Sequence, residues 1–96
     1  MSAPYGSSPV FDENTLPDAL RGEHRTKPGT WGLLRVLEGE VRLVFEGSPG
    51  PLTVTADDPA IIPPEAPHHV ECDGPMRMQV EFYREPPVVS RDADNG

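Results

Sequence analysis

The sequence predicts an all-β fold, a single domain closed as a β-barrel or jelly roll. Thirteen prolines and nine glycines divide the 96 residues into pieces that are too short for stable helices but long enough for strands. Several pieces alternate apolar and polar residues with a period of two, which is typical of half-buried strands. About seven or eight short strands without a crossover helix favour a closed barrel, because closure removes exposed edges.

The chain length leaves room for one hydrophobic core. Residues 1–8 and 89–96 are small or polar and show no hydrophobic period, so we expect two flexible tails around a domain at 9–88. The first element expected in the domain is one helical turn, which Thr15 caps, Pro17 opens and Gly22 ends.

The remaining elements are expected to be strands, because they are rich in β-branched, aromatic and aliphatic residues and are bounded by Gly, Pro and Asp. The segments with this character are 22–26, 30–37, 41–46, 52–55, 60–62, 68–72 and 76–83. Gly39, between two glutamates, predicts a tight hairpin turn between the second and third segments. Pro63 and Pro64 donate no hydrogen bonds and therefore end the fifth segment.

Composition excludes several classes of function. The formal net charge of −8 would repel a phosphate backbone, so we expect no nucleic-acid partner. The single cysteine, Cys72, allows no intrachain disulfide. Residues 1–10 lack the features of a signal peptide, and no apolar run approaches the length of a membrane span, so we expect a cytoplasmic protein without membrane contact. A core this small makes a homodimer a further expectation.

Two segments resemble motifs of a known family. The segment 61–71, IIPPEAPHHVE, is similar to the second cupin motif, in which a proline-rich turn delivers a histidine into the mouth of a barrel. In that motif His68 is the residue in register. The segment 24–39, which contains HRTKPGTWG and VLEG, resembles the opening of the TehB/YeaR-like small cupin family. The resemblance extends from about Phe11 to Tyr83 and implies a cupin-like barrel, or double-stranded β-helix.

The resemblance also implies a role in tellurite resistance or another stress response, because members are similar to a module of tellurite-resistance methyltransferases. It does not carry methyl transfer to these 96 residues, which have room for the cupin-like module alone. The sequence departs from the common metal-binding cupins. Lys27 and Gly32 stand near the positions where those proteins have ligands, so the usual shell of three histidines and one glutamate is incomplete.

The remaining donors define a candidate site at the barrel mouth. His24 and His68 are the natural pair, since the side chain of His69 must point to the opposite face of its strand. Glu81 is expected as a third metal ligand, and Gln79, on the same face of the last strand, as a ligand-binding residue. Two imidazoles and a carboxylate suit a divalent metal such as zinc, iron or nickel. Lys27 instead favours an oxyanion or another small molecule.

The alternatives stay open at this point. His24 and His68 can equally hydrogen-bond backbone or carboxylate groups without a metal. The leading hypothesis is a small stress-associated cupin that binds a metal ion, a small ligand or an oxyanion. The others are a metal-dependent oxygenase and a noncatalytic protein-interaction module with structural histidines. Whether the protein is an enzyme is left undecided by the sequence.

Overall fold

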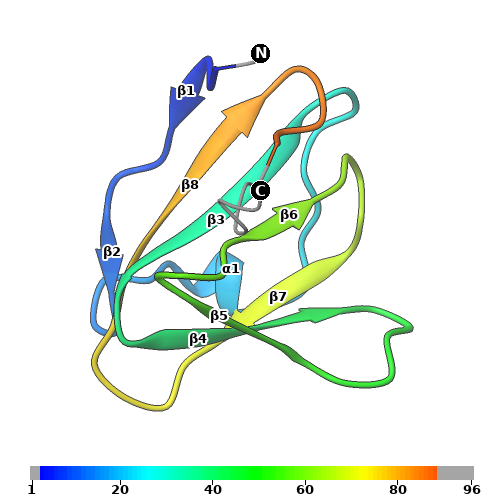
Figure 1. Ribbon diagram of the computed structural model, residues 1–96. Coiled ribbons are helices and arrows are strands. Elements are labelled where there is room, and N and C mark those ends of the chain that lie inside the picture. The colour runs from blue at the N-terminus through cyan, green and yellow to red at the C-terminus, as the bar shows by residue number, and fades with distance from the viewer. Residues whose placement is uncertain (1–2, 89–96) are drawn as a thin grey trace.

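The computed structural model describes residues 3–88, which form eight strands and one helical turn (Figure 1). In chain order the elements are β1 (Gly6–Ser7), β2 (Phe11–Asp12), α1 (Asp18–Arg21), β3 (Trp31–Glu38), β4 (Glu40–Phe45), β5 (Leu52–Thr55), β6 (Ala60–Ile62), β7 (His68–Glu71) and β8 (Arg77–Tyr83). Every strand pairing in this part of the chain is antiparallel. The predicted all-β class is confirmed.

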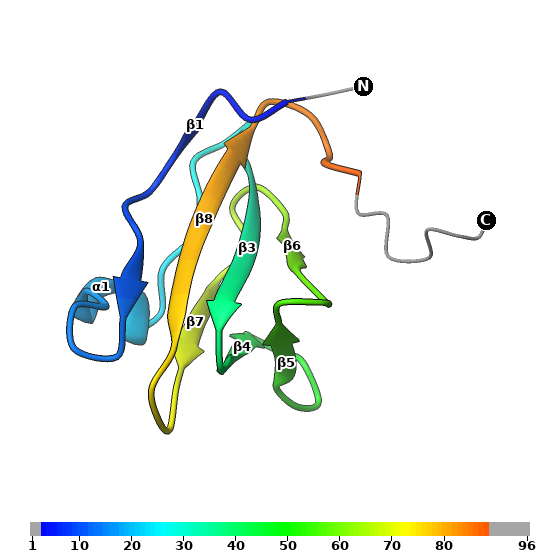
Figure 2. The same cartoon turned by 60° about the vertical axis from the view of Figure 1, so that its left-hand side comes forward.

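The strands form two sheets. The larger sheet has the order β1-β8-β3-β6, and β2 pairs with another part of β8. The smaller sheet has the order β5-β4-β7. Figure 2 shows α1 beside β2, and α1 also contacts β7 of the smaller sheet. The ladders between the described strands do not close these two sheets into a barrel, so the structure shows two antiparallel sheets where the sequence predicted closure.

The core lies between the two sheets and draws on both. Leu34 and Met78 of the larger sheet are fully buried, as are Leu43 and Val54 of the smaller one. On β8 the buried Met78 shares its face with Val80, since side chains on a strand alternate between two faces. This face of β8 positions the site described below.

The predicted hairpin at Gly39 is wrong. β3 pairs with β6 and β8, whereas β4 pairs with β5 and β7, so the chain passes from one sheet to the other at this residue. Gly39 has a φ of 73°, in the left-handed region that favours glycine. A Cβ atom here would collide with the carbonyl oxygen of Pro75 and lie 3.2 Å from the Cα of Met76. Glycine therefore allows a sharp corner between the sheets.

The predicted helical turn is present, but Thr15 does not cap it. The N-cap position is Pro17, which has no capping side chain, and the turn ends where the Gly22 N–H donates to the carbonyl oxygen of Asp18 at 3.2 Å. The hydroxyl of Thr15 instead accepts from the Asp12 N–H at 2.8 Å. Thr15 therefore stabilises the turn that precedes the helix.

The N-terminal segment forms part of the larger sheet. The Tyr5 N–H donates to the carbonyl oxygen of Phe82 at 2.8 Å, and the Ser8 N–H donates to that of Val80 at the same distance. These residues fall in the segment 1–8 that the sequence analysis assigned to a tail. The other predicted tail, 89–96, lies outside the described residues.

Candidate functional site

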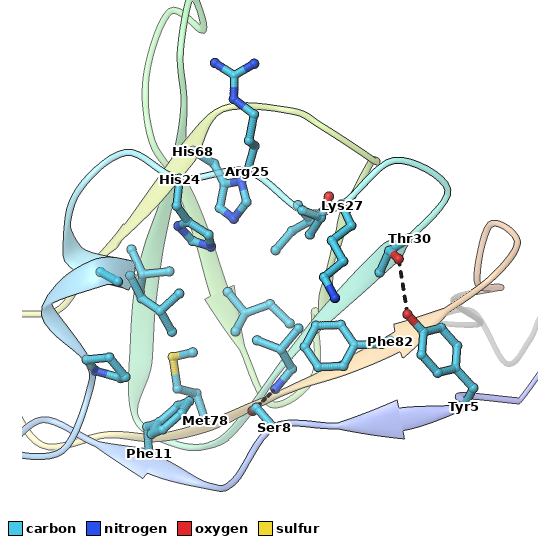
Figure 3. Close-up of a pocket in the computed structure, with 18 residues that line it drawn as sticks. Tyr5, Ser8, Phe11, His24, Arg25, Lys27, Thr30, His68, Met78 and Phe82 are labelled. Carbon is cyan, nitrogen blue, oxygen red and sulfur yellow. Dashed lines mark hydrogen bonds between the residues drawn. The ribbon is translucent and has the colours of Figure 1, made fainter.

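A cavity of about 610 Å³ opens between the two sheets on the side of α1 (Figure 3). Its apolar lining includes Leu34 of β3, Ile62 of β6 and Met78 of β8. Phe11 and Leu20, from β2 and α1, complete the wall that the sheets do not supply. The volume lies in the range of pockets that hold small organic molecules.

His24 and His68 lie at one end of this cavity. Their backbones form a two-residue bridge, with His24 N–H to His68 O at 2.9 Å and His68 N–H to His24 O at 2.8 Å. The ring centroids are 4.1 Å apart. The structure thus brings together the two histidines that the sequence paired. The predicted strand at 22–26 is reduced to this one bridge.

A hydrogen bond determines which ring nitrogen of His68 carries the hydrogen. His68 is only 2% exposed, and its Nδ1 lies 2.7 Å from the carbonyl oxygen of Ala66. Because a carbonyl oxygen only accepts, Nδ1 carries the hydrogen and Nε2 is an acceptor in the neutral ring. His24 Nδ1 is buried and has no hydrogen-bond partner among residues 3–88. The pair therefore contains one buried ring nitrogen, His24 Nδ1, without a partner in this part of the chain.

Burial favours the neutral form of both rings. The pKa of His24 is lowered mainly by desolvation, against a smaller opposing effect of the Gly22 backbone. Desolvation also lowers the pKa of His68, and the neighbouring His24 and His69 add to the effect, while the hydrogen bond to Ala66 opposes it. Both imidazoles are thus expected to be uncharged at neutral pH.

The histidines should make the protein less stable in mild acid. An unfolded chain takes up protons on these residues as the pH falls through about 6.5, whereas the folded protein resists protonation to a lower pH. The free energy of unfolding is therefore expected to fall between pH 7.5 and 5.5. Urea titrations across this range should give a shallower decline for His24→Phe. The same decline in this variant would contradict the assignment.

Lys27 is the cationic group of the cavity. Its residue is exposed and lines the cavity, and Figure 3 draws its side chain among the lining residues. Arg25 also lines the cavity, but its guanidinium extends away from the histidines and lies 3.7 Å from Glu23. Among residues 3–88, none of those that line the cavity is an Asp or a Glu.

The structure places neither Gln79 nor Glu81 at the cavity. The Gln79 amide donates to the carbonyl oxygen of Ser8 at 2.9 Å. Glu81 accepts from the Arg35 guanidinium at 2.8 Å and from the Tyr83 hydroxyl at 3.0 Å. Both lie on the opposite face of β8 from the cavity-lining residues Val80 and Phe82. The alternation along β8 was read correctly, but the face that looks inward is the apolar one.

The expected metal ligands are therefore not assembled as a set. Residues 3–88 contain no group of three or more His, Cys, Asp or Glu side chains that could hold a metal ion. His24 and His68 supply two imidazoles, and Glu81 is held by Arg35 on the far face of β8. The two-histidine, one-carboxylate shell does not fit this arrangement. Val80 and Phe82, on the opposite face of β8 from Gln79 and Glu81, line the cavity instead.

In the described part of the chain, no helix is both long and apolar enough to cross a membrane.

Curated relatives include the probable S-adenosyl-L-methionine-dependent methyltransferase TehB from two strains of Haemophilus influenzae, each 42% identical over 38 residues. Those residues are 40% of this chain and 13% of the relative.

Solved structures similar to this one include two with TM-scores above 0.7. The crystal structure of TehB from Haemophilus influenzae superposes with a TM-score of 0.76 at 28% identity, covering 85% of this chain and 31% of that one. The crystal structure of an Escherichia coli K12 protein gives a TM-score of 0.73 at 24% identity, with 85% and 89% coverage, and shows likeness of fold alone. The TehB-like domain family matches residues 6–80. The chain therefore belongs to the TehB-like domain family.

Proposed function

We propose that the protein binds a small organic molecule in the cavity, with the apolar body of the ligand against β8 and its polar end beside the polar side chains of the lining. The observation that carries the proposal is the cavity itself, about 610 Å³ in volume and walled by apolar side chains. The polar side chains in its lining include His24, His68 and Lys27. A cavity with apolar walls and a few convergent polar groups is the usual form of a small-molecule site.

The cupin-like barrel expected from the sequence is part of this proposal. The cavity opens between two sheets and is bordered by the segment with the proline-rich turn, as expected for a barrel mouth. An inorganic oxyanion such as tellurite fits the apolar walls poorly, because it would lose hydration over most of its surface. Burial of apolar ligand surface, in contrast, contributes about 25 cal/mol per Å². The walls therefore favour an organic ligand.

A neutral fluorescent probe tests the proposal. N-phenyl-1-naphthylamine is expected to bind with increased emission, and Val80→Trp is expected to reduce its affinity by about tenfold or more, because the indole would occupy the cavity. The matched control is Leu52→Trp, which adds the same side chain at a residue of β5 that is 48% exposed. Absence of binding by the wild type, or equal affinities in both variants, would overturn the proposal.

A second candidate function is binding of zinc, iron or nickel by the histidine pair. The specific observation is that His24 Nδ1 is buried without a partner, while His68 Nε2 is left as an acceptor. Water or a bound ligand would have to complete the coordination shell. Elemental analysis of untagged protein should then find metal that is lost in the His24→Ala/His68→Ala variant. Metal-free wild type, after incubation with each ion and desalting, would refute this candidate.

A further inference from the structure

We infer that the cavity selects organic monoanions, in which one carboxylate is carried by an apolar body and is held beside Lys27. This inference rests on the proposed small-molecule site and specifies the class of ligand. It is carried by two features of the cavity: the sign of its charges, and the unpaired state of Lys27 among residues 3–88.

The charges that line the cavity are opposite in sign to those of the chain. Asp and Glu outnumber Lys and Arg by 16 to 8 in the sequence. In the described part of the chain, the charged side chains that line the cavity are nevertheless Arg25 and Lys27, without an acidic residue. A negative group is therefore attracted to this cavity while the rest of the surface repels it.

Lys27 has no partner among the residues that the structure describes. Each Arg in residues 3–88 makes an ion pair, a hydrogen bond or a ring contact, whereas no such contact is found for Lys27 in this part of the chain. The other basic residues with these contacts are Arg21, Arg25, Arg35, Arg42, Arg77 and Arg84. Lys27 thus has an ammonium group at the cavity that is available to a carboxylate.

Lys27 then contacts the head of the ligand while its apolar part lies against Val80 and Phe82. One cation matches one negative charge, so a dianion such as a phosphate monoester would be left partly uncompensated. An amine would be repelled by Lys27.

Three ligands with the same ten-carbon chain distinguish the contribution of the head group to affinity from that of the apolar chain. Decanoate, 1-decanol and decylamine are titrated, below their micelle-forming concentrations, against bound N-phenyl-1-naphthylamine at pH 7.5 and low salt. Decanoate is expected to displace the probe at a concentration about five- to tenfold lower than 1-decanol, with decylamine the weakest. The readout is the ratio of the decanoate and decanol affinities, which cancels the contribution of the shared chain.

Substitutions assign the preference to Lys27. Lys27→Met keeps an unbranched side chain and is expected to bring the ratio close to one, and Lys27→Glu is expected to favour decylamine over decanoate. The control Arg77→Met also removes one positive charge, but at a residue of β8 that pairs with Glu38 and does not line the cavity, and should keep the wild-type ratio. Thermal unfolding confirms that each variant is folded before it is titrated.

The outcomes distinguish the inference from the proposed function. If the neutral probe binds the wild type but decanol competes as well as decanoate, the anion preference is wrong and the small-molecule site stands. The same follows if Lys27→Met keeps the preference, or if Arg77→Met loses it to the same extent. If the probe does not bind at all, the proposed function fails first.

Discussion

Gly39→Ala is expected to lower the free energy of unfolding by more than about 4 kcal/mol, which would leave much of the protein unfolded at 25 °C. Two costs combine at this residue. A φ of 73° is unfavourable for any side chain with a Cβ atom by roughly 1–2 kcal/mol. The added carbon would also collide with the carbonyl oxygen of Pro75, a backbone atom that cannot rotate away. The corner between the sheets would have to shift.

Gly47→Ala is the matched control, because it isolates the first cost. Gly47 has a φ of 84°, but no heavy atom lies within 4 Å of the position that its Cβ would occupy. Urea unfolding of this variant should show a loss of about 1–2 kcal/mol. Similar losses at the two glycines would mean that the contact with Pro75 does not constrain the corner.

Gly39 also illustrates what the sequence predicts about this fold. A glycine between two alternating segments marks a change of direction, so the ends of β3 and β4 were predicted to within a residue or two. It does not determine whether the two strands pair with each other. That choice depends on contacts between distant segments, because β3 pairs with β8, more than thirty residues later in the chain. The segments were therefore predictable, but their distribution between two sheets was not.

The candidate site shows a similar division. The proline-rich turn and its resemblance to a cupin motif identified His68, and the earlier motif identified His24; the structure brings these residues together. Alternation along β8 separated Gln79 and Glu81 from Val80 and Phe82 correctly. The alternating pattern of a strand defines two faces but does not show which of them borders a cavity. Because metal ligands were expected, the polar face of β8 was predicted to line the site, whereas the apolar face lines the cavity.

Membership of the TehB-like domain family does not by itself supply a function for the cavity. The chain spans 31% of the TehB chain that it resembles, and the curated matches cover a still smaller share of their relatives. Function must therefore be argued from the site. The cytoplasmic location, the homodimer and a role in stress resistance stay predictions from the sequence.

Leu34→Ala should couple stability to ligand binding. Leu34 is fully buried and also lines the cavity, so the substitution is expected to destabilise the protein by about 2–5 kcal/mol and to weaken N-phenyl-1-naphthylamine binding about fivefold through lost wall contacts. The matched control is Leu43→Ala, where an equally buried leucine in β4 does not line the cavity. It should lose comparable stability while it keeps the affinity for the probe within about twofold.

Comparison of the two leucine variants distinguishes a loss of ligand contacts from a loss of core packing alone. A ligand that binds only the folded protein raises its stability by RT ln(1 + [L]/Kd), so a given probe concentration should rescue Leu43→Ala more than Leu34→Ala. Thermal unfolding with and without the probe measures this difference directly. Equal rescue of the two variants would mean that the probe does not contact Leu34, and the ligand would then have to occupy another part of the molecule.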